Sequence, residues 1–150
     1  EPTTALDVTT QAQILETFRD LQAEVGAATI LITHDLAVVA ETADRVAVMY
    51  AGRIVEETTT TQLFAAPRHP YTHGLLGSIP HMADASEADE RGRLPEIEGT
   101  VPALWALPPG CPFSPRCPRA RERCGIKRPP LAELAPGHRA ACWYPVEAAG

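Results

Sequence analysis

Apolar residues recur at helical spacing in the first part of the chain. Between residues 14 and 25 they are separated by steps of one, three, three and four positions, which places them on one face of a predicted helix. Thr9 or Thr10 is expected to cap its start, and Gly26 suits the left-handed backbone that ends a helix. Residues 29–33 form a β-branched apolar run that predicts a buried strand. The helical face consists of Ile14, Leu15, Phe18, Leu21 and Val25.

A second series of elements follows this predicted strand. Asp35 is placed to cap a helix that continues to about residue 43, and residues 45–50 predict another strand. Ala51 and Gly52 predict a tight turn into a return strand over residues 53–56. This order of helix, strand, helix, strand and strand is typical of the later part of an α/β domain whose sheet ends in a hairpin.

The pattern changes after residue 62. Residues 63–79 predict helix in pieces, broken at Pro67 and Pro70, and the prolines and acidic residues beyond Pro80 predict irregular backbone. Of the 15 prolines, only Pro2 precedes Pro67, and all four cysteines follow Gly110. We therefore predict two parts: an α/β portion over residues 1–62 and a loop-rich, cysteine-containing appendage over residues 63–150.

Charge supports this division and limits the possible partners. The chain of 150 residues carries 13 basic and 19 acidic residues, which excludes a generally basic nucleic-acid binder, and we expect no nucleic-acid partner. Residues 1–62 hold 3 of the basic and 10 of the acidic residues, so the second part is nearly neutral. No apolar run approaches the roughly 20 residues that a membrane-spanning helix needs.

Candidate chemistry in the first part lies where the predicted strand ends. Thr33, His34 and Asp35 lie directly at the end of the predicted strand. In open α/β sheets, ligands bind beyond the carboxyl ends of strands. An imidazole and a carboxylate at this place are candidates for orienting a water molecule and contacting a phosphate group.

The sequence Glu-Pro-Thr-Thr-Ala-Leu-Asp at residues 1–7, followed by a helix and by Ile-Leu-Ile-Thr-His-Asp at residues 30–35, resembles the ATP-binding subunit of ABC transporters. The resemblance covers residues 1 to about 62 and implies the C-terminal part of a P-loop-type nucleotide-binding domain. It implies that Glu1 polarises the attacking water and that His34 contacts the γ-phosphate. Ala5, Leu6 and Asp7 match the loop through which two ATP sites communicate at a dimer interface.

Several elements of such a domain do not occur in this sequence. There is no Gly-x-x-x-x-Gly-Lys-Ser/Thr segment to bind phosphates, and no Leu-Ser-Gly-Gly signature or Q-loop. We interpret the chain as a C-terminal fragment of a longer subunit, which would use ATP with Mg²⁺. By itself the fragment is expected to be inactive.

The appendage has its own resemblance. His69-Pro70-Tyr71 resembles the C-terminal region of the oligopeptide and dipeptide branch of ABC importers, and we expect these residues to form a packing turn. The resemblance implies an ATPase subunit that powers import of peptides, or of a related solute such as nickel. Its partners would be a second ATP-binding subunit, transmembrane permease subunits and, indirectly, an extracytoplasmic solute-binding protein. Its place would be peripheral, on the cytoplasmic face of the inner membrane.

Four cysteines lie within the last 40 residues, with five, six and seventeen residues between successive members. This spacing fits simple zinc-ribbon patterns poorly. Four thiolates suit an iron–sulfur cluster, with zinc as the next alternative and disulfides or free thiols last. Similarity to peptide importers associated with a [4Fe–4S] cluster favours the first. His138 is an alternative ligand, but the apolar Trp143 favours Cys142. The four are Cys111, Cys117, Cys124 and Cys142.

Basic residues surround these cysteines and give residues 111–150 a net charge of +4. They are expected to offset the charge of a thiolate-bound cluster, to face anionic lipid, or to be solvated. A second function from another class also fits the cysteines: a non-enzymatic metal-binding module with a structural or redox role. A P-loop in sequence preceding Glu1 would favour the transporter hypothesis.

Overall fold

The computed structural model describes residues 6–79 and 96–147. The chain divides after residue 44 into two compact units, which are described separately. The predictions for Glu1, Ala5 and the acidic residues that follow Pro80 lie outside the described residues. No helix in the described ranges is long and apolar enough to cross a membrane.

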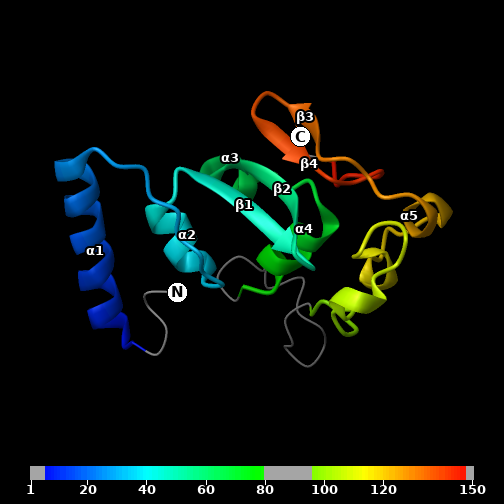
Figure 1. Ribbon diagram of the computed structural model, residues 1–150, viewed down its shortest axis with the longest axis horizontal. Helices are drawn as coiled ribbons and strands as arrows, with labels where there is room; N and C mark the ends of the chain where they lie inside the picture. The colour runs from blue at the N-terminus through cyan, green and yellow to red at the C-terminus, as the bar shows by residue number, and fades with distance from the viewer. Residues whose placement is uncertain (1–5, 80–95, 148–150) are drawn as a thin grey trace. The chain divides into compact units, whose positions relative to one another are not determined.

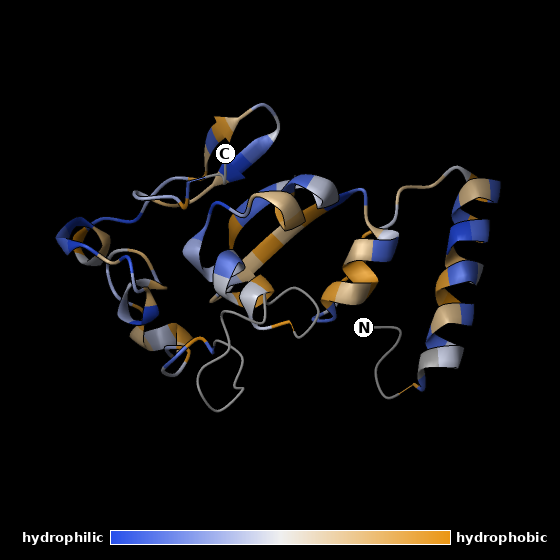
Figure 2. Cartoon of the chain, turned by 180° about the vertical axis from the view of Figure 1, so that it is seen from behind, coloured by the Kyte–Doolittle hydropathy of each residue, from blue (hydrophilic) through white to orange (hydrophobic). Residues whose placement is uncertain are grey.

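The first unit begins with the predicted helix. Helix α1 spans Val8–Val25, and Figure 2 shows polar and apolar residues alternating along it. Its N-cap is Asp7, whose carboxylate accepts a hydrogen bond from the Thr10 amide, so the expectation that Thr9 or Thr10 caps the helix was wrong. Gly26 ends the helix with a φ of 66°, which confirms the predicted left-handed position.

The strand predicted over residues 29–33 is not formed. Ile30 and Ile32 are 92% and 73% exposed, and no strand among the described residues pairs with this segment. A strand exists only through hydrogen bonds to a neighbour, so β-branched composition alone does not produce one. Helix α2 (Leu36–Thr42) follows as predicted, with Asp35 accepting hydrogen bonds from the amides of its first turn.

The second unit is built on an antiparallel sheet in the order β1-β2-β4-β3 (Figure 1). Strands β1 (Arg45–Tyr50) and β2 (Arg53–Thr59) form the predicted hairpin. Ala51 and Gly52 turn the chain with φ values of 47° and 75°. Positive φ at both central positions matches the right-handed twist of the strands.

A short hairpin from the end of the chain completes this sheet. Strands β3 (Ala132–Ala135) and β4 (His138–Ala140) pair with each other, and β4 pairs with β2. The sequence pattern did not predict these two strands. Their pairing places residues from both sides of the boundary predicted after residue 62 in one sheet.

Short helices occupy the rest of the second unit. Helix α3 (Thr60–Ala65) and helix α4 (Pro70–Gly77) are the two pieces predicted around Pro67 and Pro70. The 3₁₀ turns η1 (Leu104–Ala106) and η2 (Ser114–Arg116) and helix α5 (Glu122–Ile126) lie in the loop-rich region. The described structure is therefore mixed helix and small antiparallel sheet, as expected for the C-terminal part of an ABC ATPase.

An aromatic cluster forms the core of the second unit. The rings of Tyr50, Tyr71 and Phe113 lie with centroids 4.7 to 5.4 Å apart in edge-on or tilted geometry.

The guanidinium of Arg116 donates to the backbone carbonyls of Ile97 and Glu98 at 2.7 and 2.8 Å. Residues far apart in the sequence thus fix the loop that carries the first cysteines.

Candidate functional site

The residues expected to act on ATP lie in the first unit. Glu1 and Ala5 are outside the described residues, and Leu6 and Asp7 lie immediately before α1. The Asp7 carboxylate accepts from the Thr10 amide at 3.0 Å and from its hydroxyl at 2.7 Å, and these bonds lower the pKa of Asp7. His34 is exposed, next to the Asp35 cap of α2. The roles assigned to these residues stay predictions.

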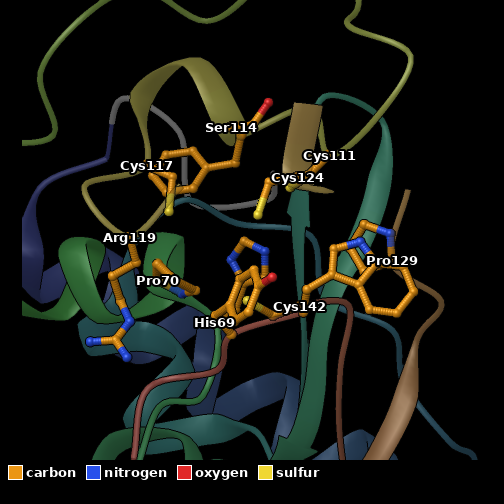
Figure 3. Close-up of a pocket in the computed structure, with 12 residues that line it drawn as sticks. His69, Pro70, Cys111, Ser114, Cys117, Arg119, Cys124, Pro129 and Cys142 are labelled. Atoms are coloured by element: carbon orange, nitrogen blue, oxygen red, sulfur yellow. The ribbon is translucent and has the colours of Figure 1, made fainter. Parts of the chain in front are cut away.

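All four cysteines line one small cavity in the second unit (Figure 3). Cys111 comes from the loop before η2, Cys117 ends η2, Cys124 lies within α5, and Cys142 follows β4. All four are free thiols. The cavity has a volume of about 20 Å³, which is the space of about one water molecule.

Close backbone contact brings the first and third cysteines together. The Cys111 amide donates to the Cys124 carbonyl oxygen at 2.7 Å. Gly110 precedes it, and a Cβ atom at this position would overlap the Cys124 carbonyl oxygen. Only glycine therefore permits the loop to approach α5 this closely.

Burial is the main influence on the pKa values of three of the thiols. It raises the pKa of Cys111, of Cys117 and, to about 11, of Cys142. The other thiols of the group raise these values further, because each thiolate repels the next. Without a cation among them, the thiols of Cys111, Cys117 and Cys142 therefore hold their protons.

Backbone amides act in the opposite direction, and they do so in a repeated arrangement. The thiol of Cys111 accepts a hydrogen bond from the Phe113 amide, that of Cys117 from Arg119, and that of Cys142 from Tyr144. In each case one donor lies two residues after the cysteine, and the Ser114 amide is a second donor to Cys111. These bonds lower the thiol pKa, and amide hydrogen bonds to sulfur are one means by which proteins tune metal-bound thiolates.

Thiol sulfur atoms are suitable ligands for a soft metal, but the four thiols are not spaced as the ligands of a metal centre. Among the residues that the structure describes, no group of three or more His, Cys, Asp or Glu side chains is arranged so that it could hold a metal ion. The ligand set predicted from sequence thus has the right chemical type and a shared location, without the geometry of a loaded site.

The two histidines near the cysteines already have other partners. His69 Nδ1 accepts from the Tyr71 amide at 3.1 Å, and the ring also bonds to the Ala141 backbone. Burial lowers the pKa of His69 to about 4, so the ring is neutral at pH 7. His138, the alternative ligand, does not line the cavity, and its Nε2 lies 2.6 Å from Glu56 Oε1.

Glu56 connects the sheet to the turn before the cysteine region. It is fully buried in β2, and its carboxylate accepts from the amides of Arg68 and His69 at 2.6 and 2.9 Å while it contacts His138. Sequence reasoning missed this residue. The sequence carried no local signal for it, because side chains alternate faces along a strand, yet Val55 and Glu56 are both buried.

Comparison with known proteins matches both parts of the chain. Residues 55–124 match the family described as "Oligopeptide/dipeptide transporter, C-terminal region". A probable peptide ABC transporter ATP-binding protein of Sinorhizobium fredii is 55% identical over 143 residues, which are 95% of this chain and 42% of the relative. A putative peptide import ATP-binding protein of Brucella ovis is 52% identical over 99% of this chain and 45% of the relative.

A dipeptide transport ATP-binding protein of Escherichia coli is 49% identical over the whole of this chain and 44% of its own length. The chain thus spans less than half the length of the curated relatives that it matches.

Proposed function

Since the chain belongs to the oligopeptide/dipeptide family of ABC transporter ATP-binding proteins, we propose that it is the C-terminal part of a subunit whose ATP hydrolysis powers peptide import. The observation that carries this proposal is sequence identity of about one half along the entire chain to relatives with such names. We further propose that this part is inactive by itself, because ATP binding needs a P-loop that these residues do not contain.

In this proposal, Glu1 polarises the water that attacks ATP bound with Mg²⁺, and His34 contacts the γ-phosphate. Residues 5–7 relay between two ATP sites across a subunit dimer. The exposure of His34 leaves it accessible to a nucleotide, which supports its role.

The proposed partners are a second ATP-binding subunit, permease subunits and, indirectly, a solute-binding protein. The proposed location is the cytoplasmic face of the inner membrane, to which the subunit is held peripherally by the permease. The alternative of a non-enzymatic metal module stays a prediction that no comparison supports.

The ATP-site proposal is tested in the intact subunit. Glu1→Gln and His34→Ala are each expected to leave ATP binding intact and to suppress steady-state turnover. His73→Ala is the matched control, because His73 is exposed on α4 and has no assigned role; it should retain turnover. Near-normal turnover in either test variant would overturn the assignment.

We propose in addition that the four cysteines together hold one metal centre, a [4Fe–4S] cluster in preference to zinc. Two observations support the set: all four line one cavity, and three of the thiols accept amide hydrogen bonds from the residue two positions later. Such bonds favour thiolate, which is the form that binds metal. A cluster would supply one-electron chemistry or rigid cross-linking of the loops.

Loading must move the thiols. The volume between them accommodates about one water molecule, so the loops that carry Cys111 and Cys117 would have to open. Both loops lack long secondary structure, and the Cys111 loop is held by its backbone hydrogen bond to Cys124 and by side-chain contacts such as those of Arg116. Neither loop is a strand of the sheet, so both can shift without breaking the hydrogen bonds between strands.

The metal proposal is tested by anaerobic purification. A brown protein with about four irons per chain is expected, since a Cys₄ cubane needs four. Each Cys→Ser variant should lower the iron content, whereas Ser114→Ala, which alters the same cavity without removing a thiol, should not. His138→Gln should leave the iron content unchanged if Cys142 is the fourth ligand, and should lower it if His138 is. A colourless protein with one zinc per chain would show that the site holds zinc and not a cluster. Disulfides in protein isolated from a reducing cytosol would refute both the cluster and the zinc site.

A further inference from the structure

A groove separate from the cysteine cavity lies on the surface of the second unit. It has a volume of about 280 Å³ and is lined by Pro118, Arg119, Ala120, Arg121 and Tyr144. The cysteine cavity measures only about 20 Å³ on the same scale. The groove thus has room for many water-sized groups, enough for an ion with four oxygen atoms.

Aromatic rings stack on two guanidinium groups in this part of the chain, and one of these groups, Arg121, lines the groove. The Arg121 guanidinium lies 4.3 Å from the centroid of the Tyr144 ring, and that of Arg123 lies 3.6 Å from the Trp143 ring. The Trp143 ring is itself fixed, because its N–H donates to the Lys127 carbonyl at 2.8 Å. Stacking uses the face of a guanidinium and leaves the N–H donors at its edge available.

Within residues 6–79 and 96–147, no carboxylate forms an ion pair with these guanidinium groups. Among the described residues, the arginines that form ion pairs with carboxylates are Arg45 and Arg139, both with Glu57. No side-chain hydrogen bond or ion pair engages the guanidinium of Arg119 or Arg121 within the same ranges. The positive charge of the groove is therefore uncompensated in a region whose net charge is +4.

We propose that this groove binds a phosphate group through Arg119 and Arg121. A guanidinium presents paired N–H donors that match two phosphate oxygens, which makes arginine suited to this anion. Stacking on Tyr144 fixes the Arg121 side chain before binding, so less rotamer entropy is lost when the anion arrives. The proposal requires neither the ATP-site roles nor a metal centre.

The groove shares two residues with the cysteine cavity. Arg119 and Tyr144 line both, and their backbone amides donate to the thiols of Cys117 and Cys142. A phosphate held in the groove would therefore restrain two of the segments that carry the cysteines. This gives the binding a second readout: phosphate should slow alkylation of Cys117 and Cys142 at constant pH and ionic strength.

The experiment titrates the 150-residue chain with inorganic phosphate and pyrophosphate at low ionic strength, followed by calorimetry. The double variant Arg119→Gln/Arg121→Gln is expected to weaken binding at least tenfold. Its matched control is Arg45→Gln/Arg139→Gln, which removes the same charge from arginines that already pair with Glu57, and which should change the affinity less than twofold. Equal losses in the two double variants would overturn the proposal, because binding would then follow net charge alone.

Two further measurements complete the test. Tyr144→Leu keeps both charges but removes the stacking, and it should weaken phosphate binding by a smaller factor than the double variant. Binding to vesicles of phosphatidylglycerol, with phosphatidylcholine as control, distinguishes the source of the phosphate. If free phosphate competes with the vesicles for the chain, the bound phosphate group is that of a lipid headgroup. If the chain binds free phosphate but not the vesicles, the ligand is a soluble anion. Failure to bind either probe overturns the proposal.

Discussion

The two units of the chain differ most in how they bury their large side chains. In the first unit, Phe18, Leu21 and Val25 on α1 remain substantially exposed, and Ile30 beyond the helix is 92% exposed. In the second unit, Phe113 is 2% exposed although it lies in a proline-rich loop. The region with regular apolar periodicity therefore has little core of its own, and the irregular region has one.

This difference shows that a periodic pattern of apolar residues indicates which face of a helix can be buried, but does not show that the face is buried. An apolar face becomes a core only when another element covers it, and in the first unit α1 and α2 offer little surface for this purpose. In the second unit, aromatic residues separated by more than 60 positions meet directly.

The largest expected effect concerns the buried acid of the second unit. Glu56→Ala removes the acceptor of two backbone amides and leaves His138 without its partner. Breaking a buried pair in this way typically costs about 3–5 kcal/mol, and we expect a loss of that size in the free energy of unfolding measured with urea.

The neighbouring residue provides the control. Glu57 pairs with Arg45 and Arg139 at the surface of the same strand. Such exposed pairs contribute about 0–1 kcal/mol, so Glu57→Ala should have little effect. Similar losses at both positions would show that charge on β2, and not burial, determines stability.

The next effect tests the close contact between the cysteine loops. Gly110→Ala places a methyl group against the Cys124 carbonyl and should cost about 1–3 kcal/mol, the usual range for overpacking. Gly125→Ala, beside the same cysteine, meets no atom within 4 Å and should be neutral or stabilising, because alanine favours helix. Thermal unfolding of the two variants measures the difference. An unaltered Gly110→Ala protein would mean that the two loops are not held this closely in solution.

Sequence patterns predicted helices α1 and α2 and the β1–β2 hairpin, and they missed the contacts between distant segments. Helix α2 and the β1–β2 hairpin were found because their caps and turn residues lie within a few positions of the elements that they define. The β3–β4 hairpin was missed because it is stabilised by pairing with β2, more than 80 residues earlier. Local pattern contains no information about such a partner.

The candidate site divides in the same way. The four cysteines were identified as one group from their clustering, and they do line one cavity. Glu56, Gly110 and the amide donors two residues after the cysteines were not identified, because their roles depend on backbone geometry. The sequence therefore identified residues whose role follows from their side-chain type, such as the cysteines. It did not identify residues whose role follows from where the fold places them.

A smaller effect, and one that depends on pH, is expected at the start of α1. Hydrogen bonds from Thr10 lower the pKa of Asp7 below its ordinary value of 3.8, so its capping contribution is complete above that value. The contribution is lost as pH falls through the lowered pKa, because the unfolded chain then binds the proton more readily. Helicity of α1, measured by circular dichroism, should fall over this acidic range.

The control for this helix retains the cap and removes the titration. Asp7→Asn should keep most of the helicity, since asparagine is also a good N-cap, and should abolish its dependence on acidic pH. Asp7→Ala should lower helicity at all pH values. In the intact subunit, an Asp7→Ala variant whose ATP affinity fell tenfold or more would contradict the relay role that we propose.

The smallest effect is expected where the sequence predicted a buried strand. Ile30→Ser in the 150-residue chain should change the free energy of unfolding by less than about 0.5 kcal/mol, as exposed substitutions usually do. Val55→Ser is the matched control, a β-branched residue that is buried in β2, and it should cost about 2 kcal/mol or more. In the intact subunit, Ile30→Ser should become as costly as Val55→Ser if a neighbouring strand covers residues 29–33 there. A cost near zero in both settings would show that this apolar run is not a strand of the complete domain, and the contrast between the two units would then be a property of the whole subunit.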